Sequence, residues 1–114
     1  MPEPILDMNA FENLNTLAGS DFIGELIHTF LEEAPTLLAQ LRSSLSAGDA
    51  DTFRRAAHSL KSNAASFGAT QLTELAREME GLARDLKLDD ANAKMNAVEE
   101  SYKQVAGALK GLEK

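Results

Sequence analysis

The sequence predicts an all-α protein, an antiparallel up-and-down four-helix bundle with a short additional N-terminal helix. Three observations predict this fold class. Apolar residues recur at helical spacing in nearly every segment, no alternation rich in valine or isoleucine indicates a strand, and short breaks with glycine or aspartate separate the segments. With 114 residues, the chain has the length of one domain, which we assign to residues 1–114 with a core from about residue 5 to 112.

Two helices are predicted before Gly48. The first is short, begins near Asp7 or Asn9, and includes Phe11 and Leu14. Ser20 is expected as the N-cap of the second, which should run from about residue 21 to residue 47. Its core-facing side is predicted from eight apolar residues at helical spacing: Phe22, Leu26, Ile27, Phe30, Leu31, Leu38, Leu41 and Leu45.

Pro35 interrupts the second helix. Proline lacks the N–H that the helical hydrogen-bond ladder needs, and its ring clashes with the preceding turn. We therefore expect a kink near residues 32–34 rather than a straight rod.

Three further helices are predicted after Gly48. The third should run from about Ala50 to Phe67 and end at Gly68, which suits a left-handed C-terminal cap, and the fourth from Ala69 to Lys87. Asp89 is expected to cap the fifth. Their core-facing positions are Phe53, Ala57, Leu60, Ala64 and Phe67; then Leu72, Leu75, Ala76, Met79, Leu82 and Leu86; then Ala91, Met95, Val98, Tyr102, Val105, Leu109 and Leu112.

The third helix carries a second face that lies beside its apolar one. Arg54, His58, Lys61 and Ala65 fall within an arc of roughly 60°, with Gly68 at its edge. We therefore expect His58 to point into solvent, where a neutral imidazole has a nitrogen lone pair that can attack phosphorus. An ammonium group one turn away could hold the oxygens of a phosphoryl group on that nitrogen. Spacing alone leaves open an ordinary solvated helix.

The string His-x-x-Lys-Ser-x-Ala-x-x-Phe-Gly-Ala, residues 58–69, closely resembles the signature of histidine-containing phosphotransfer (HPt) domains, the modules of multistep two-component relays. Ser62 stands where that family usually has glycine. The resemblance covers roughly residues 5–112 and includes the segments Phe30-Leu31-Glu32-Glu33-Ala34-Pro35, Leu45-x-x-Gly48-Asp49 and Leu72-x-x-Leu75-x-x-x-Met79-Glu80.

The resemblance implies a phosphocarrier that relays a phosphoryl group between the aspartates of receiver domains. It implies that His58 accepts the group on Nε2, that Lys61 stabilises it, and that the receiver supplies Mg²⁺, so that the chain needs no cofactor of its own. The partners would be response-regulator receivers, with a hybrid sensor histidine kinase as a further partner, and the chain a monomer. We expect a docking surface around Arg54, Ala65 and Gly68, with Phe11 and Leu14 of the first helix.

The net charge of −7 arises in the first third of the chain, because residues 1–41 contain seven acidic residues and no lysine or arginine. A negative field argues against nucleic acid, whose binding depends on a basic patch. Arg54, Arg55 and Lys61 predict locally basic surroundings for His58, which would attract an acidic, phosphorylated pocket. No P-loop or glycine-rich nucleotide loop is present, so we expect neither ATP binding nor autokinase activity.

Localisation is predicted from what the sequence lacks. There is no cysteine, no apolar run of the roughly 20 residues that a membrane span needs, and no basic, apolar signal-peptide pattern in residues 1–20. We expect a cytoplasmic protein without membrane contact of its own, either free or as the cytoplasmic part of a membrane-anchored hybrid kinase.

Two other functions are considered. A helical interaction or regulatory module could use the same docking face without phosphate. A helix bundle can also hold two iron atoms with paired Glu-x-x-His motifs, and Glu25-x-x-His28, with Glu32 one turn on, is one such match. Because the second motif is missing, we expect no metal site.

Overall fold

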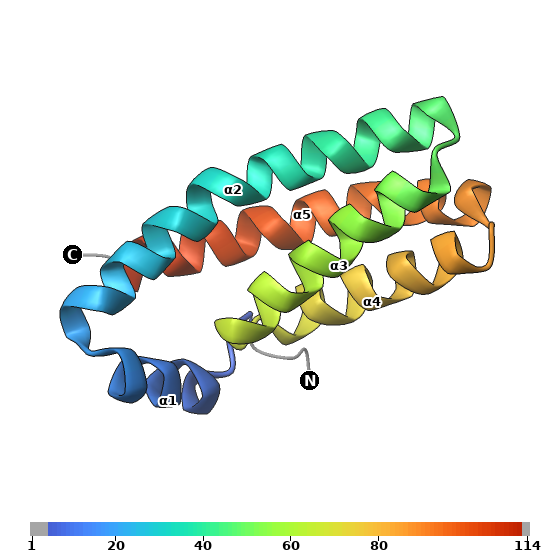
Figure 1. Ribbon diagram of the computed structural model, residues 1–114. Helices are drawn as coiled ribbons and strands as arrows, with labels where there is room; N and C mark the ends of the chain where they lie inside the picture. Colours follow the sequence, from blue (N-terminus) through green and yellow to red (C-terminus); the bar gives the residue numbers. More distant parts are fainter. Residues whose placement is uncertain (1–4, 113–114) are drawn as a thin grey trace.

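The computed structural model describes residues 5–112 as five helices and no strands (Figure 1). This confirms the predicted fold class. The helices are α1 (Met8–Ala18), α2 (Ser20–Ala47), α3 (Ala50–Ser66), α4 (Thr70–Arg84) and α5 (Leu88–Leu112).

Helices α2 to α5 form the bundle, and consecutive helices run in opposite directions as neighbours (Figure 1). Contacts between α2 and α5 close the ring. Helix α1 lies across the end of the bundle where α2 begins, against α2 and α3 (Figure 1). The long α2 packs against α3, and the long α5 packs against α4. Helices α3 and α4 are the pair that carries the candidate site.

The start of α1 agrees with the prediction, whereas the start of α2 differs by one residue. The Asp7 carboxylate accepts a hydrogen bond from the backbone N–H of Asn9 at 3.0 Å, which makes Asp7 the N-cap of α1. Gly19, with a φ of 87°, occupies the N-cap position of α2, and Ser20 is already helical. The predicted Ser20 cap is therefore wrong, because the backbone turns at the glycine, which adopts a positive φ without steric cost.

Helix α2 continues through Pro35 as one helix of 28 residues (Figure 1). Pro35 is exposed, so its ring lies away from the core. The predicted core side is confirmed at Ile27, Phe30 and Leu41 but not at Phe22, which is 51% exposed. Its neighbour Ile23 is buried instead.

Helix α3 follows the prediction closely. All five residues of its predicted apolar face are buried. Gly68, with a φ of 72°, ends the helix, as the backbone N–H of Ala69 donates to the carbonyl of Ala64 at 3.0 Å and that of Gly68 to Ala65 at 3.1 Å. This pattern is a Schellman motif, and it confirms the predicted left-handed cap.

The turn after α4 differs from the prediction. The helix ends at Arg84, and Leu86 has a φ of 60° and is 80% exposed, so it does not belong to the core. The backbone N–H of Lys87 donates to the carbonyl of Leu82 at 2.7 Å, the same closure that Gly68 allows after α3. Because α5 begins at Leu88, Asp89 lies in its first turn, where a negative charge favours the helix dipole, and not at the N-cap.

The core is continuous between the four long helices. In α5 the predicted seam is buried except for Tyr102, which is half-buried with its ring 6.0 Å from that of Phe30; the Leu112 side chain lies outside the described part. On the outside, Arg42 of α2 pairs with Glu99 and donates to Asn96 of α5 at 3.1 Å.

Candidate functional site

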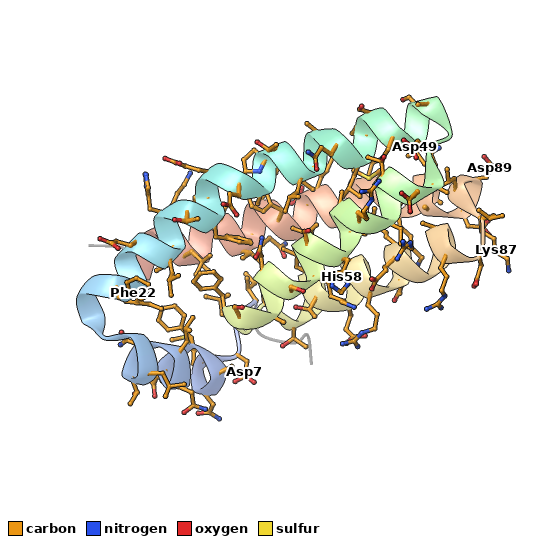
Figure 2. The ribbon with its side chains drawn as sticks, viewed as in Figure 1. Asp7, Phe22, Asp49, His58, Lys87 and Asp89 are labelled. Carbon is orange, nitrogen blue, oxygen red and sulfur yellow. The ribbon has the colours of Figure 1, made fainter. Side chains whose placement is uncertain are left out.

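His58 lies near the middle of α3, on the side of the helix toward α4 (Figure 2). Its side chain is 59% exposed, whereas Ala57 and Leu60 beside it in the sequence are buried. The buried face therefore anchors the backbone while the imidazole remains accessible, as the spacing predicts.

Glu80 of α4 brings His58 and Lys61 together. Its Oε2 lies 2.7 Å from His58 Nδ1, and its Oε1 accepts a hydrogen bond from Lys61 Nζ at 2.6 Å. One carboxylate thus bridges the two predicted site residues. The side chains of Glu80 and Lys61 are only 18% and 23% exposed, so the ion pair lies partly within the α3–α4 seam.

The electrostatics favour an ionised Glu80. The hydrogen bond from Lys61 lowers the pKa of the Glu80 carboxyl below its ordinary value, and the bond with His58 adds to this effect, while partial burial opposes it. Glu80 therefore remains a carboxylate at neutral pH and acts as a hydrogen-bond acceptor.

The contact with Glu80 selects one tautomer of a neutral His58. A carboxylate only accepts hydrogen bonds, so the 2.7 Å contact places the ring proton on Nδ1. The lone pair is then on Nε2, the nitrogen that Glu80 does not contact. The sequence alone does not identify Glu80 as a functional residue, although Glu80 ends the run Leu72-x-x-Leu75-x-x-x-Met79-Glu80. The signal that identifies it is structural: its carboxylate, on the neighbouring helix α4, contacts both His58 and Lys61.

The other predicted site residues are not all on one surface. Ala65 is exposed, on the same face of α3 as His58. Arg54 is exposed, but its guanidinium donates to Asp51 at 3.2 Å, within its own helix. Phe11 and Gly68 are buried.

The burial of Gly68 has a definite cause in α1. The backbone N–H of Asp7 donates to the Gly68 carbonyl at 2.6 Å, and a Cβ added at Gly68 would lie 2.7 Å from the Asp7 carbonyl oxygen and 3.0 Å from the Cβ of Ala10. The predicted place of Gly68 in the docking surface is therefore corrected: the residue is buried, and its missing side chain makes room for α1.

A groove of about 580 Å³ runs along the other flank of His58, between α2 and α3. Its lining is Glu32, Glu33, Thr36, Leu37, His58, Ser59, Ser62 and Asn63. A second hollow of about 240 Å³ follows toward α1 and shares Glu33 and Asn63 with the first; the rest of its lining is Leu14, Leu26, Thr29, Phe30, Ser66 and Phe67. Together the groove and this hollow form one trough, and Leu14 of α1 borders it.

The surroundings of His58 are not basic, contrary to the prediction. Arg54 and Arg55 both pair with Asp51, and Lys61 pairs with Glu80. The α2 side of the groove adds Glu32 and Glu33. The expectation fails for two reasons: Asp51 of α3 itself pairs with both arginines, and α4 and α2 place further carboxylates beside Lys61 and His58, which the α3 sequence alone does not reveal.

The residues considered as metal ligands form a surface pair. His28 Nε2 lies 2.7 Å from Glu32 Oε1, and both side chains are more than half exposed. Within residues 5–112, no group of three His, Cys, Asp or Glu side chains is placed to hold a metal ion. No helix in this part of the chain is long and apolar enough to cross a membrane.

Comparisons with known proteins give two findings. The family model described as the Hpt domain matches residues 25–108, from within α2 into α5. A crystal structure of histidine-containing phosphotransfer protein B from Pseudomonas aeruginosa PAO1 is similar to this chain with a TM-score of 0.90 and 30% identity, over 96% of this chain and 95% of that one. No curated protein matches the chain.

Proposed function

The chain belongs to the Hpt domain family, and from this premise we propose that it is a phosphocarrier in which His58 accepts a phosphoryl group from one receiver-domain aspartate and delivers it to another. The observation that carries the proposal is the Glu80 carboxylate, which contacts both His58 Nδ1 and Lys61 Nζ. A family match identifies the module, and this contact supports His58 as the residue that carries the phosphate.

The chemistry begins with the lone pair on His58 Nε2. It attacks the phosphorus of the phosphoaspartate, the new N–P bond forms, and the bond from phosphorus to the aspartate oxygen breaks, so the aspartate leaves as a carboxylate. The ring keeps its proton on Nδ1 and becomes positively charged. Glu80, which accepts the hydrogen bond from Nδ1, stabilises that developing charge. Transfer to a second aspartate reverses these steps.

Lys61 is the second group that we propose for the site. Its Nζ is bonded to Glu80 beside the histidine, and an ammonium group can turn from one anion to another because its three donors lie on a flexible stem. A phosphoryl group on Nε2 provides such an anion. We propose that Lys61 then shares its donors between Glu80 and the phosphoryl oxygens.

The proposed partners follow from the same function. The receiver supplies the Mg²⁺ and the acidic pocket, and the chain itself has no autokinase activity. Docking uses the exposed face at Ala65 and the groove beside His58, and Arg54 lies at the edge of that face. We also propose that the domain acts as a monomer in the cytoplasm, free or attached to a hybrid kinase.

The test is phosphotransfer from a purified, phosphorylated receiver. The wild-type chain should acquire an acid-labile, base-stable phosphate, as expected of phosphohistidine, and the His58→Gln variant should acquire none. His28→Gln is the matched control and should be labelled normally. Label that persists in His58→Gln or disappears in His28→Gln would refute the assignment, and a chain that binds receivers without ever being labelled would be the unphosphorylated regulatory module instead.

Lys61→Ala separates transfer from stability. We expect phosphotransfer to slow by roughly ten- to hundredfold, the effect of losing a charged hydrogen bond of about 1.5–3 kcal/mol in the transition state. Because the Lys61–Glu80 pair is partly buried, the free energy of unfolding should fall, by up to about 1 kcal/mol. Transfer at the wild-type rate would remove Lys61 from the site.

A further inference from the structure

The trough beside His58 has two chemically different parts. Next to the histidine, its α2 wall carries Glu32 and Glu33, and its α3 wall carries the polar Ser59 and Ser62. Toward α1, the lining is mainly apolar, with Leu14, Leu26, Phe30 and Phe67. Glu33 belongs to both parts, so one carboxylate stands where the polar and apolar stretches meet.

The permanently charged side chains in the lining of the trough are Glu32 and Glu33, and both are negative. None of the residues that line its two parts is a lysine or an arginine. Glu32 is paired with His28, whereas no cation within the described ranges forms an ion pair with Glu33, which is exposed. A partner that covers Glu33 without offering a cation would bury an uncompensated charge, which is strongly unfavourable.

We infer that the trough selects receivers whose docking surface presents an apolar patch together with a lysine or arginine positioned against Glu33. This inference rests on the proposed function and names the chemistry by which one receiver is preferred to another. Burial of the apolar part of the trough stabilises the complex with the receiver. Glu33 discriminates between receivers, because like charges that meet at an interface lower the affinity for the wrong partner. A receiver with an acidic residue at that position would therefore be a poor donor and a poor acceptor.

The experiment compares charge reversals at two exposed glutamates. Glu33→Lys reverses a charge in the lining of the trough. Glu100→Lys, on α5, changes the net charge equally at a residue that lines neither part of the trough. With a receiver that has a basic residue on its docking surface, we expect Glu33→Lys to lower kcat/KM for phosphotransfer by about tenfold at low salt and by less at about 1 M salt, where the Debye length is only about 3 Å. Glu100→Lys should have little effect.

A compensating change in the receiver makes the test specific. Replacing the basic residue of the receiver's docking surface by glutamate should weaken transfer to the wild-type chain and restore transfer to the Glu33→Lys variant. Equal effects of Glu33→Lys and Glu100→Lys, or no effect of either, would overturn the inference while wild-type transfer through His58 still supports the proposed function. If His58 accepts phosphate from no receiver, the proposed function itself fails.

Discussion

Glu80 contacts His58 from a different helix. The two residues are 22 positions apart in the sequence, and the helical period that places Lys61 near His58 says nothing about α4. The sequence thus predicts which residues share a face of α3, whereas the carboxylate between them depends on how α3 and α4 pack. Glu80 becomes recognisable only when its partial burial and its two contacts are known.

Replacing Glu80 should change the tautomer of His58. In Glu80→Ala, Nδ1 loses its acceptor, so the proton should no longer be held there, and phosphotransfer should slow by roughly ten- to hundredfold. Glu80→Gln should retain part of the effect, because its amide oxygen still accepts from Nδ1. The imidazole ¹⁵N chemical shifts identify the protonated nitrogen, and a purely structural role would leave them unchanged.

Glu74→Ala is the control for this experiment. Glu74 lies on the same helix, is exposed, and pairs with Arg77 one turn away instead of with α3. Its replacement should leave both the ¹⁵N shifts and the transfer rate of His58 unaltered. If the shifts of His58 are the same in Glu80→Ala and Glu74→Ala, Glu80 does not position the ring.

The ends of the helices were harder to predict than their core-facing sides. The five-residue apolar face of α3 is confirmed in full because its spacing fits one helical period. In α4, however, the helical spacing of apolar residues continues in the sequence to Leu86, beyond the end of the helix at Arg84. The backbone turns at Leu86 with a φ of 60°, so an apolar residue lies in a turn. Local pattern therefore predicts faces well, and the geometry of turns depends on the neighbouring elements.

Gly68 illustrates two constraints at one turn. Its positive φ is the property that the sequence predicts, and the close approach of α1 is the one that only the fold reveals. Both exclude a side chain. The short first helix is thus fixed to the bundle at the turn that follows the histidine helix.

Gly68→Ala should destabilise the protein by about 1–3 kcal/mol, because alanine resists the positive φ and its Cβ would collide with the backbone of Asp7. Hydrogen exchange should show that the protection of α1 falls more than that of α4. The matched control is Gly24→Ala in α2, where a Cβ meets nothing within 4 Å and should stabilise the helix by about 0.5–1 kcal/mol. Equal unfolding free energies for the two variants would contradict this account.

Three carboxylates in different parts of the molecule make its stability depend on pH. Thr52 lowers the pKa of Asp49 at the start of α3, Lys61 lowers that of Glu80 between α4 and α3, and Arg42 lowers that of Glu99 between α5 and α2. Each group is more acidic in the folded chain than its ordinary value. The stability that they contribute is therefore present above that ordinary value and is lost as the pH falls through the lowered one.

We expect the free energy of unfolding to decrease as the pH falls below about 4.5, the region of ordinary carboxyl pKa values. Urea unfolding at a series of pH values measures the curve. Glu99→Gln should flatten its acid limb, and an unchanged limb would exclude the Arg42–Glu99 pair as a contributor.

The position of His58 has a kinetic consequence under the proposed function. One flank of the imidazole is occupied by Glu80, and the other opens into the trough. Donor and acceptor receivers must then bind one after the other at the same open flank of His58, and no complex of all three proteins forms. Relay through this domain should obey ping-pong kinetics with parallel double-reciprocal plots. An excess of unphosphorylated donor should slow the flow, since it occupies the place where the acceptor has to dock.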